Sequence, residues 1–350
     1  MNFASDNVMG ASRSVLDALV RANDGPLPAY GADPITARVE RRFSEIFERE
    51  VSVSLVATGT AANALAIAAM VPPWGACVCH QEAHVMEDEC GAPEFYMHGG
   101  KLMGLPGTGA KIGLETLQAF LAWLKPSYRQ MPPRALSISQ ATESGLVYRP
   151  DEIAALAQAC RPHGIGLHMD GARFANALVA VGCTPAEMTW KAGIDILSFG
   201  GTKNGCLAAE AIVVFDPALA ETLGYRRKRA GHVLSKGRLL AAQFEGYLAE
   251  DHWLDNARHA NRMASRLAAG LRRLGIRLAW PCEANEVFPI LPRAVDERLR
   301  AAGAVYHPWS PVSLAPEERI GPDETLVRLV ASFVTQEDLV GRFLAVAEGK

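Results

Sequence analysis

The segment from Ala57 to Asn63 combines residue types that can bind an anion. It ends a β-branched run and begins an alanine-rich run, so a strand should give way to a helix here. The N-terminus of a helix presents unpaired N–H groups and a positive dipole end, and Gly59 lets an anion approach the backbone. Thr58 and Thr60 can bind a phosphate in this position, although threonine capping of the helix would explain the same residues.

A carboxylate and a basic residue occur together in the segment His168–Arg173. Asp170 ends a predicted strand, and open α/β sheets bind their ligands at the carboxyl ends of strands. A carboxylate in this position can hold a protonated ring nitrogen. It can equally cap a helix that begins near Ala172, and this segment alone leaves both interpretations open.

The segment Ser198–Gly205 places Lys203 after a hydrophobic strand, between glycines and small polar residues. A lysine in a tight pocket can lose its proton and form a Schiff base with an aldehyde. Taken alone, the segment is more typical of a solvated loop lysine.

The three segments together are more specific than any one of them. An anchor for phosphate, a carboxylate for a ring nitrogen and a lysine for covalent attachment occur in this order, each after a predicted strand. The interval from Asp170 to Lys203 leaves room for one helix and one strand. Pyridoxal phosphate requires this set of contacts, so the sequence predicts that cofactor, with Lys203 as its point of attachment.

The surrounding pattern predicts the elements that position these residues. Short hydrophobic strands alternate with helices, which predicts an α/β fold with a mainly parallel sheet covered by helices on both faces. The predicted strands are 51–57, 135–140, 166–170, 194–199 and 211–215, and the predicted helices are 61–71, 150–161 and 173–181.

The pattern changes after about Glu245. A long charged helix at 252–274 is followed by 277–291, 325–333 and a closing helix from Gln336. This order predicts a smaller C-terminal α+β domain. The domains are therefore predicted as an N-terminal arm at 1–14, a large cofactor-binding domain at 15–245 and a small domain at 246–350.

The composition of the 350 residues is that of a globular protein, with 49% hydrophobic and 21% charged residues. A formal net charge of −3 argues against a general nucleic-acid binder. The N-terminus lacks the pattern of a signal peptide, and no apolar run approaches the roughly 18 residues of a membrane helix. Seven cysteines, an odd number, predict reduced thiols in a cytoplasmic protein.

The motifs of this chain resemble those of the low-specificity L-threonine aldolases, which belong to the fold-type-I enzymes that use pyridoxal phosphate. The resemblance extends over nearly the whole chain. The matching segments are Ala4–Asn7, Tyr30–Pro34, Thr58–Thr60 with Asn63, Glu82–His84, Asp88–Ala92, Asp170–Arg173, Lys203 and Arg328.

This resemblance implies a role for each matching residue. Ser5, Arg173 and Arg328 would bind the substrate carboxylate, and Tyr30 would also lie at the substrate. His84 would stack on the cofactor ring. The remaining cofactor contacts would be Thr58, Gly59 and Thr60 at the phosphate, Asp170 at the pyridine nitrogen, Lys203, Arg173 and the basic region that includes Arg238. The implied reaction cleaves a β-hydroxy-α-amino acid into glycine and an aldehyde, in a dimer-based tetramer with sites at subunit interfaces.

Two positions depart from the pattern of the family. Glu143 stands in a turn where many members have a histidine, and Asn204 follows the lysine where glycine is commoner. These changes bear on proton transfer and on side-chain preference. His84, directly or through water, or Glu143 would take the β-hydroxyl proton, and L-threonine, L-allo-threonine and L-phenylserine are the substrates to test.

The sequence also leaves other interpretations open. The same scaffold supports transaminases and β-eliminating lyases, and a cofactor-binding protein without turnover is a further alternative. Cys77, Cys79, His80 and His84 could suggest a metal site, but their spacing lacks a second paired half, so no metal is predicted. The run 87–89 could form a cation site or a carboxylate pair, but it is more typical of a solvated helix start, with support of the cofactor neighbourhood as an alternative for Glu89. Trp253, Trp280 and Trp309 are predicted to serve packing.

Overall fold

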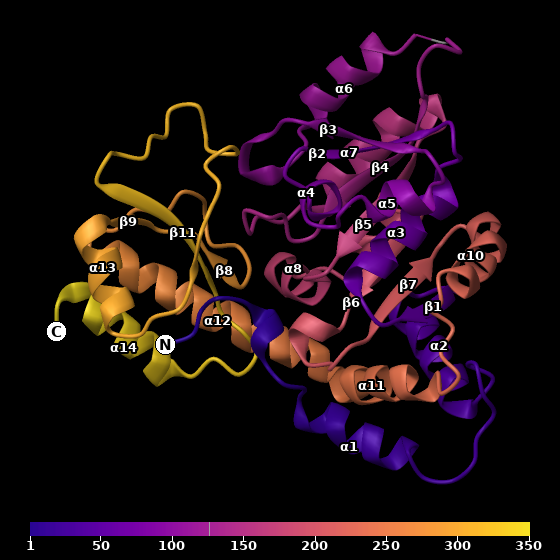
Figure 1. Ribbon diagram of the computed structural model, residues 1–350, viewed down its shortest axis with the longest axis horizontal. Helices are drawn as coiled ribbons and strands as arrows, with labels where there is room; N and C mark the ends of the chain where they lie inside the picture. Colours follow the sequence, from indigo (N-terminus) through magenta and orange to yellow (C-terminus); the bar gives the residue numbers. More distant parts are fainter. Residues whose placement is uncertain (126) are drawn as a thin grey trace.

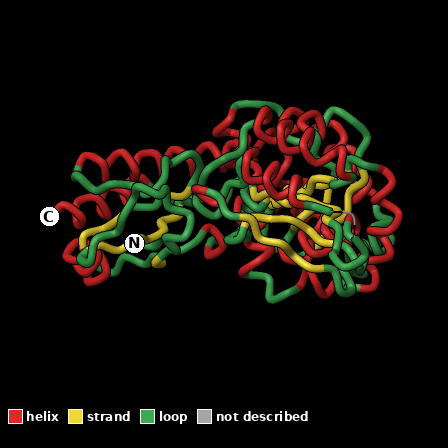
Figure 2. The backbone as a smooth tube through the Cα atoms, turned by 90° about the horizontal axis from the view of Figure 1, so that it is seen from above, coloured by secondary structure: helices red, strands yellow, loops and turns green. Residues whose placement is uncertain are grey.

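The computed structural model describes residues 1–125 and 127–350, which form a large and a small lobe (Figures 1 and 2). The large lobe contains a seven-stranded sheet, and the small lobe an antiparallel sheet with three helices. The strands of the large lobe are β1 Ser52–Val56, β2 Ala76–His80, β3 Lys101–Leu105, β4 Pro133–Ser139, β5 Gly166–Gly171, β6 Ile196–Gly200 and β7 Glu210–Val214. Its helices are α1 Arg13–Ala22, α2 Pro34–Ile46, α3 Gly59–Met70, α4 His84–Glu87, α5 Ala92–Tyr96, α6 Leu114–Trp123, α7 Pro150–Cys160, α8 Phe174–Val181, α9 Pro185–Met188, α10 Pro217–Arg229 and α11 Arg238–Leu248.

The large sheet has the strand order β1-β7-β6-β5-β4-β2-β3. All neighbouring strands are parallel except β7, which runs antiparallel to both β1 and β6. The segment 201–209 between β6 and β7 is shorter than the roughly dozen residues that a parallel crossover needs, so β7 must return antiparallel. Lys203 lies in this short connection, directly at the end of β6.

Helices cover both faces of the sheet, as the alternating pattern predicted. Along β7, Ala211 and Val213 belong to the hydrophobic core on one face, with residues of α2, α8 and α11. Ile212 and Val214 belong to the core on the other face, with residues of α3 and α10. Side chains of a strand point alternately to its two faces, so one β-branched run supplies both cores. The prediction of an α/β fold with a mainly parallel sheet is confirmed.

The small lobe has its own hydrophobic core, which includes Met263, Leu267, Leu329 and Phe343. Phe3 of the N-terminal arm packs into this core, and its backbone bonds Val305 and Val330. The first half of α12 packs in the core of the large lobe and its second half in that of the small lobe. Because α12 belongs to the cores of both lobes, it does not mark a boundary between them, and the predicted limits of the domains stay a prediction. The elements of this lobe are α12 His252–Arg273, β8 Glu286–Val287, β9 Ile290–Pro292, α13 Arg293–Ala301, β10 His307–Pro308, β11 Glu324–Val330 and α14 Glu337–Glu348.

Among residues 1–125 and 127–350, no helix combines the length and the apolar composition that crossing a bilayer requires.

Candidate active site

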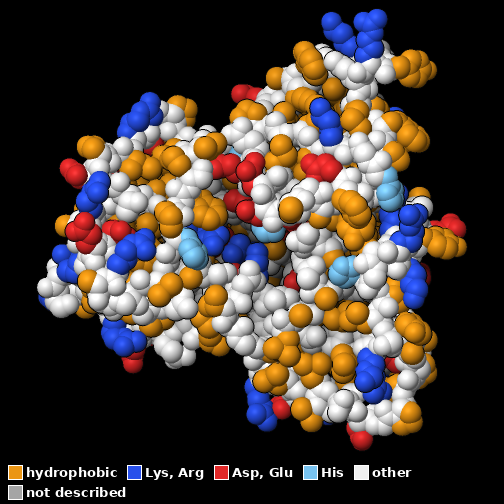
Figure 3. Space-filling model, viewed as in Figure 1, with side chains coloured by type: hydrophobic (Ala, Val, Ile, Leu, Met, Phe, Trp, Pro, Cys, Tyr) orange, Lys and Arg blue, Asp and Glu red, His pale blue; other side chains and the backbone are white. Residues whose placement is uncertain are grey.

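A cavity of about 590 Å³ lies where the two lobes meet, at the carboxyl ends of the parallel strands. This volume is typical of sites for small molecules. Figure 3 shows a hollow between the lobes, with acidic and basic side chains on its opposite sides. Ten residues that the sequence singled out line this cavity: Ser5, Thr58, Gly59, Thr60, His84, Glu143, Asp170, Arg173, Lys203 and Arg328.

The N-terminus of α3 forms one end of the cavity. Thr58 is the N-cap residue, and its side-chain oxygen accepts a hydrogen bond from the N–H of Ala61. A Cβ placed on Gly59 would meet no atom within 4 Å, so open space lies against the backbone at this point. Helix α3 begins at Gly59, two residues before the predicted start, because this cap organises its first turn. The open helix end with its flanking hydroxyl groups suits a phosphate group.

Asp170 lies at the end of β5 and is held by two hydrogen bonds. Its Oδ1 accepts the N–H of Ala172 at 3.0 Å, and its Oδ2 accepts from Asn63 Nδ2 at 2.9 Å. Helix α8 begins at Phe174, with Arg173 as its N-cap residue, so Asp170 does not cap that helix. The carboxylate instead lines the cavity, where it would accept a hydrogen bond from a protonated ring nitrogen.

Asn63 also connects Asp170 to His84, an arrangement that sequence reasoning missed. The Nδ2 group of Asn63 donates to Glu89 Oε1 at 2.9 Å, and the same oxygen lies 2.9 Å from His84 Nδ1. Glu89 is 4% exposed, and α4 ends at Glu87. The predicted solvated helix start at 87–89 is therefore wrong for Glu89, whose carboxylate turns inward because two donors bind it there. The sequence signals for Glu89 were its place in the family-like segment Asp88–Ala92 and its interval of five residues from His84.

Lys203 lies in a short 3₁₀ turn at the start of the connection between β6 and β7. Burial, and after it the positive charge of Arg173, lowers the pKa of Lys203. A lowered pKa favours the free amine that covalent attachment needs. Asn204 anchors this turn from behind, because its Nδ2 group donates to Tyr247 Oη at 2.7 Å and to the Trp253 carbonyl at 2.8 Å. Asn204, which departs from the family pattern, therefore stabilises this turn and does not line the cavity.

Arg173 and Arg328 approach the cavity on the side of the small lobe. Arg173 makes a two-pronged bond to Asp6, with N–O distances of 2.8 and 3.0 Å. Although burial alone would lower the pKa of Arg173, the charges of Asp6 and Glu286 raise it. The oxygen Oε1 of Glu286 lies 3.3 Å from Arg173 and 3.9 Å from Arg328. Two buried carboxylates thus balance the two guanidinium groups.

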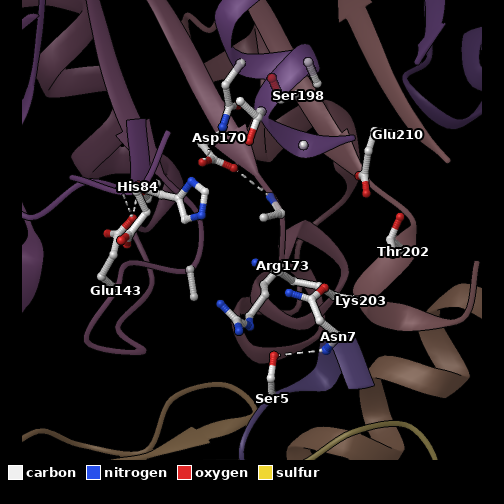
Figure 4. A pocket seen from close by; sticks show the side chains of 18 of the residues that line it. Ser5, Asn7, His84, Glu143, Asp170, Arg173, Ser198, Thr202, Lys203 and Glu210 are labelled. Atoms are coloured by element: carbon white, nitrogen blue, oxygen red, sulfur yellow. Dashed lines mark hydrogen bonds between the residues drawn. The ribbon is translucent and has the colours of Figure 1, made fainter. Parts of the chain in front are cut away.

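Three residues on this side were not predicted to have a role. Asp6 adjoins the predicted Ser5, but Glu286 carried no signal beyond being an acid within an apolar run. Trp309 was predicted to serve packing rather than function, yet it lines the cavity, and the guanidinium of Arg328 lies over its ring at 4.4 Å. Trp253 and Trp280 are buried, as predicted. Figure 4 shows Ser5 and Asn7 opposite Asp170 and His84, with Arg173 and Lys203 between them.

Glu143 lies beside His84. Its Oε1 accepts the backbone N–H of His84 at 2.8 Å and the hydroxyl of Ser139 at 3.0 Å. Its Oε2 is buried and has no hydrogen-bond partner among residues 1–125 and 127–350. Burial raises the pKa of Glu143 to about 7. The turn that differs from the family pattern thus holds the backbone of His84.

Two predicted residues lie outside the cavity of the single chain. Tyr30 is 58% exposed, and Lys228 lies over its ring at 5.0 Å. Arg238 begins α11 and donates to the carbonyl of Gly25 at 3.0 Å. The roles of both residues stay predictions.

The residues of the cavity fit the predicted cofactor. An open helix N-terminus for phosphate, a carboxylate for the pyridine nitrogen and an amine with a lowered pKa all line one cavity of suitable size. Each group comes from a different strand end, in the order that the sequence predicted.

Known proteins resemble this chain in sequence and in overall fold. The model of the beta-eliminating lyase family matches residues 2–293. Low-specificity L-threonine aldolases from a Pseudomonas species and from Pseudomonas aeruginosa are 44% and 45% identical over 86% of this chain and 87% of theirs. The threonine aldolase of Leishmania major superposes with a TM-score of 0.91 at 30% identity, over 99% of this chain and 98% of that one. The chain therefore belongs to the beta-eliminating lyase family, among the low-specificity L-threonine aldolases, and is a pyridoxal-phosphate-dependent lyase.

Proposed function

We propose that the protein cleaves L-β-hydroxy-α-amino acids at the Cα–Cβ bond, giving glycine and an aldehyde. The observation that carries this proposal is one cavity lined both by the cofactor-binding residues and by two arginines suited to an α-carboxylate. The names of the relatives, L-threonine aldolases, support the choice of reaction.

Arg173, Arg328 and Ser5 are proposed to bind the substrate carboxylate. A guanidinium group offers parallel N–H donors that match a carboxylate. Asp6 already occupies the Nε and one Nη of Arg173, so Arg173 offers its remaining edge, whereas Nε of Arg328 has no partner among the described residues. Arg328 would therefore bind the substrate carboxylate more strongly than Arg173. Holding the carboxylate fixes rotation about the bond to the amine and sets the Cα–Cβ bond for cleavage.

The other lining residues are proposed to bind the cofactor and to move protons. When bound, pyridoxal phosphate supplies an aldehyde that captures the substrate amine and a pyridine ring that withdraws electron density from Cα. Asp170 would hold a proton at the pyridine nitrogen, and Thr58, Gly59 and Thr60 would bind the phosphate. Lys203 would release its proton to attach the cofactor. His84 would take the proton of the β-hydroxyl group.

A direct assay tests the proposed reaction. The holoenzyme should release glycine and aldehyde in equal amounts from L-threonine, L-allo-threonine or L-phenylserine, without any 2-oxo acid acceptor. Ammonia with a 2-oxo acid would indicate β-elimination, and amino transfer that needs an acceptor would indicate a transaminase. Either result would refute the proposed cleavage while leaving cofactor binding intact.

Arg328→Lys should weaken substrate binding and leave the cofactor bound. Lysine keeps the charge but loses the planar fork and its stacking on Trp309, so KM for L-threonine should rise about tenfold, for a loss of roughly 1.4 kcal/mol. Absorbance of the bound cofactor should not change. Arg266→Lys, at an exposed ion pair on α12, is the matched control and should behave as wild type. Loss of the cofactor from the Arg328 variant would place this arginine at the phosphate instead.

We further propose that the chain works in the cytoplasm as a homo-oligomer, in the form of a dimer-based tetramer. The support for an oligomer comes from Tyr30 and Arg238, two predicted site residues that do not line the described cavity of their own chain. A second copy would have to bring such residues to a neighbouring site. Light scattering of the holoenzyme measures this directly.

A further inference from the structure

His84 is oriented by a buried carboxylate. Glu89 Oε1 lies 2.9 Å from His84 Nδ1, and the Glu89 side chain is fully buried whereas that of His84 is 42% exposed. A carboxylate oxygen can only accept unless it is protonated, so the Nδ1 atom of His84 must carry the hydrogen. The other ring nitrogen, Nε2, is then left as the proton acceptor of the exposed imidazole.

Asn63 fixes this carboxylate in place. Its Nδ2 group contacts both Glu89 Oε1 and Asp170 Oδ2 at 2.9 Å. Both contacts are carboxylate oxygens, so the amide must present its NH₂ group to them, and its two hydrogens are then used. Asn63 thus holds two acidic groups with one amide, and Glu89 cannot turn without breaking that bond.

The charges around His84 define its response to pH. The hydrogen bond to Glu89 raises the pKa of His84, burial acts against this, Asp170 adds to it and Lys203 opposes it. Burial raises the pKa of Glu89 itself. Glu143 faces the backbone of His84, where its Oε1 accepts the N–H. Of these groups, Glu89 touches the imidazole ring and has the largest influence on it.

Glu143 is less suited than His84 to receive a proton from substrate. One oxygen of Glu143 is occupied by two donors, and the other is buried and removed from solvent. Both residues line the cavity, but the side chain of His84 is 42% exposed and therefore accessible to a substrate there. The structure therefore favours the pair of Glu89 and His84 for proton transfer.

We propose that Glu89 is a positioning residue that holds His84 with Nε2 free and stabilises the imidazolium formed when Nε2 takes the β-hydroxyl proton. This inference rests on the proposed aldol cleavage. The O–H proton passes to Nε2, the electron pair of that O–H bond forms the aldehyde C=O, and the Cα–Cβ pair remains on Cα. Cα gains one proton to give glycine, so atoms and charge balance. A carboxylate that orients a histidine base has the same effect in serine hydrolases.

The first test compares Glu89→Gln with Glu87→Gln, an exposed matched control at the end of α4. Glutamine can present an N–H to Nδ1, which would place the hydrogen on Nε2 and block proton acceptance. Cleavage of L-threonine should fall about 100-fold in Glu89→Gln. Exchange of the glycine α-proton with D₂O needs no β-hydroxyl base and should stay close to wild type, as should absorbance of the bound cofactor. The Glu87 variant should match wild type in all three measurements.

The pH profile gives a second and independent test. A base acts when deprotonated, so kcat/KM of the wild type should rise with pH through the raised pKa of His84. Without the carboxylate of Glu89 that pKa falls, and the rising limb should move to lower pH with a lower plateau. A purely structural role would lower the plateau without moving the limb.

A double-mutant cycle then asks whether Glu89 acts through His84. In a His84→Asn background, Glu89→Gln should cause little further loss of cleavage, because its target is gone. Additive losses in the cycle, an unmoved pH limb, or equal loss of cleavage and glycine exchange would each overturn the assignment. Failure of wild type to make glycine and aldehyde would instead refute the proposed reaction, so the two failures are distinct.

Discussion

The Lys203→Ala variant should still bind the cofactor, but without a covalent bond to it. Its cleavage activity should fall on the order of 10⁴-fold or more, as in other enzymes that lose a covalent nucleophile. Lys203 is the one lysine that lines the described cavity. Burial and the charge of Arg173 lower its pKa, so its amine is more available than that of a solvated lysine. Assays of aldehyde release and absorbance of the bound cofactor measure both effects.

Borohydride reduction of the wild-type holoenzyme, followed by peptide mapping, identifies the attachment site independently. The label should appear on Lys203 alone. Lys191→Ala is a suitable control, because Lys191 forms an exposed ion pair with Glu48 and such pairs contribute at most about 1 kcal/mol. A label on another lysine, or near-normal turnover of Lys203→Ala, would refute the attachment.

Local pattern was sufficient to predict the strands and helices that position the cofactor site. Strands β1, β4, β5, β6 and β7 all begin and end within two residues of the predicted limits, because β-branched and apolar runs bounded by glycine or proline define them locally. The reversed direction of β7 was not predicted from the pattern. It follows from the short connection at 201–209, a length that was readable in the sequence.

The environment of the site was harder to predict than its central residues. Asp170 lies at the end of a strand, and Arg173 and Lys203 come soon after strand ends, so all three reach the same edge of the sheet. Glu286 and Trp309 come from the small lobe, and Asp6 from the N-terminal arm, so their approach depends on the packing of lobes rather than on local pattern. The same holds for the bond between Asn63 and Glu89, residues that lie on α3 and beyond α4. Contacts between elements distant in sequence carry no periodic signal.

Asp170→Asn should fold normally and lose turnover on the order of 100-fold. The substitution removes the charge that would keep the pyridine nitrogen protonated, and a hydrogen bond to a charged group contributes about 1.5–3 kcal/mol, or roughly 10- to 150-fold in rate. In addition, the introduced amide would accept the Ala172 N–H only by turning its NH₂ toward the NH₂ of Asn63, so two donors would face each other. Both effects act at the cavity and spare the hydrophobic core.

Asp195→Asn separates this catalytic role from a structural one. Asp195 also bonds a backbone N–H of β5, that of Leu167 at 2.7 Å, but it does not line the cavity. The Asp195 variant should therefore retain turnover even where its thermal unfolding midpoint falls. Asp170→Asn should show the reverse, with an unfolding midpoint near that of wild type and altered absorbance of the bound cofactor. Near-normal turnover of Asp170→Asn would mean that this carboxylate only holds the turn to Ala172, and the proton at the pyridine nitrogen would then need another partner.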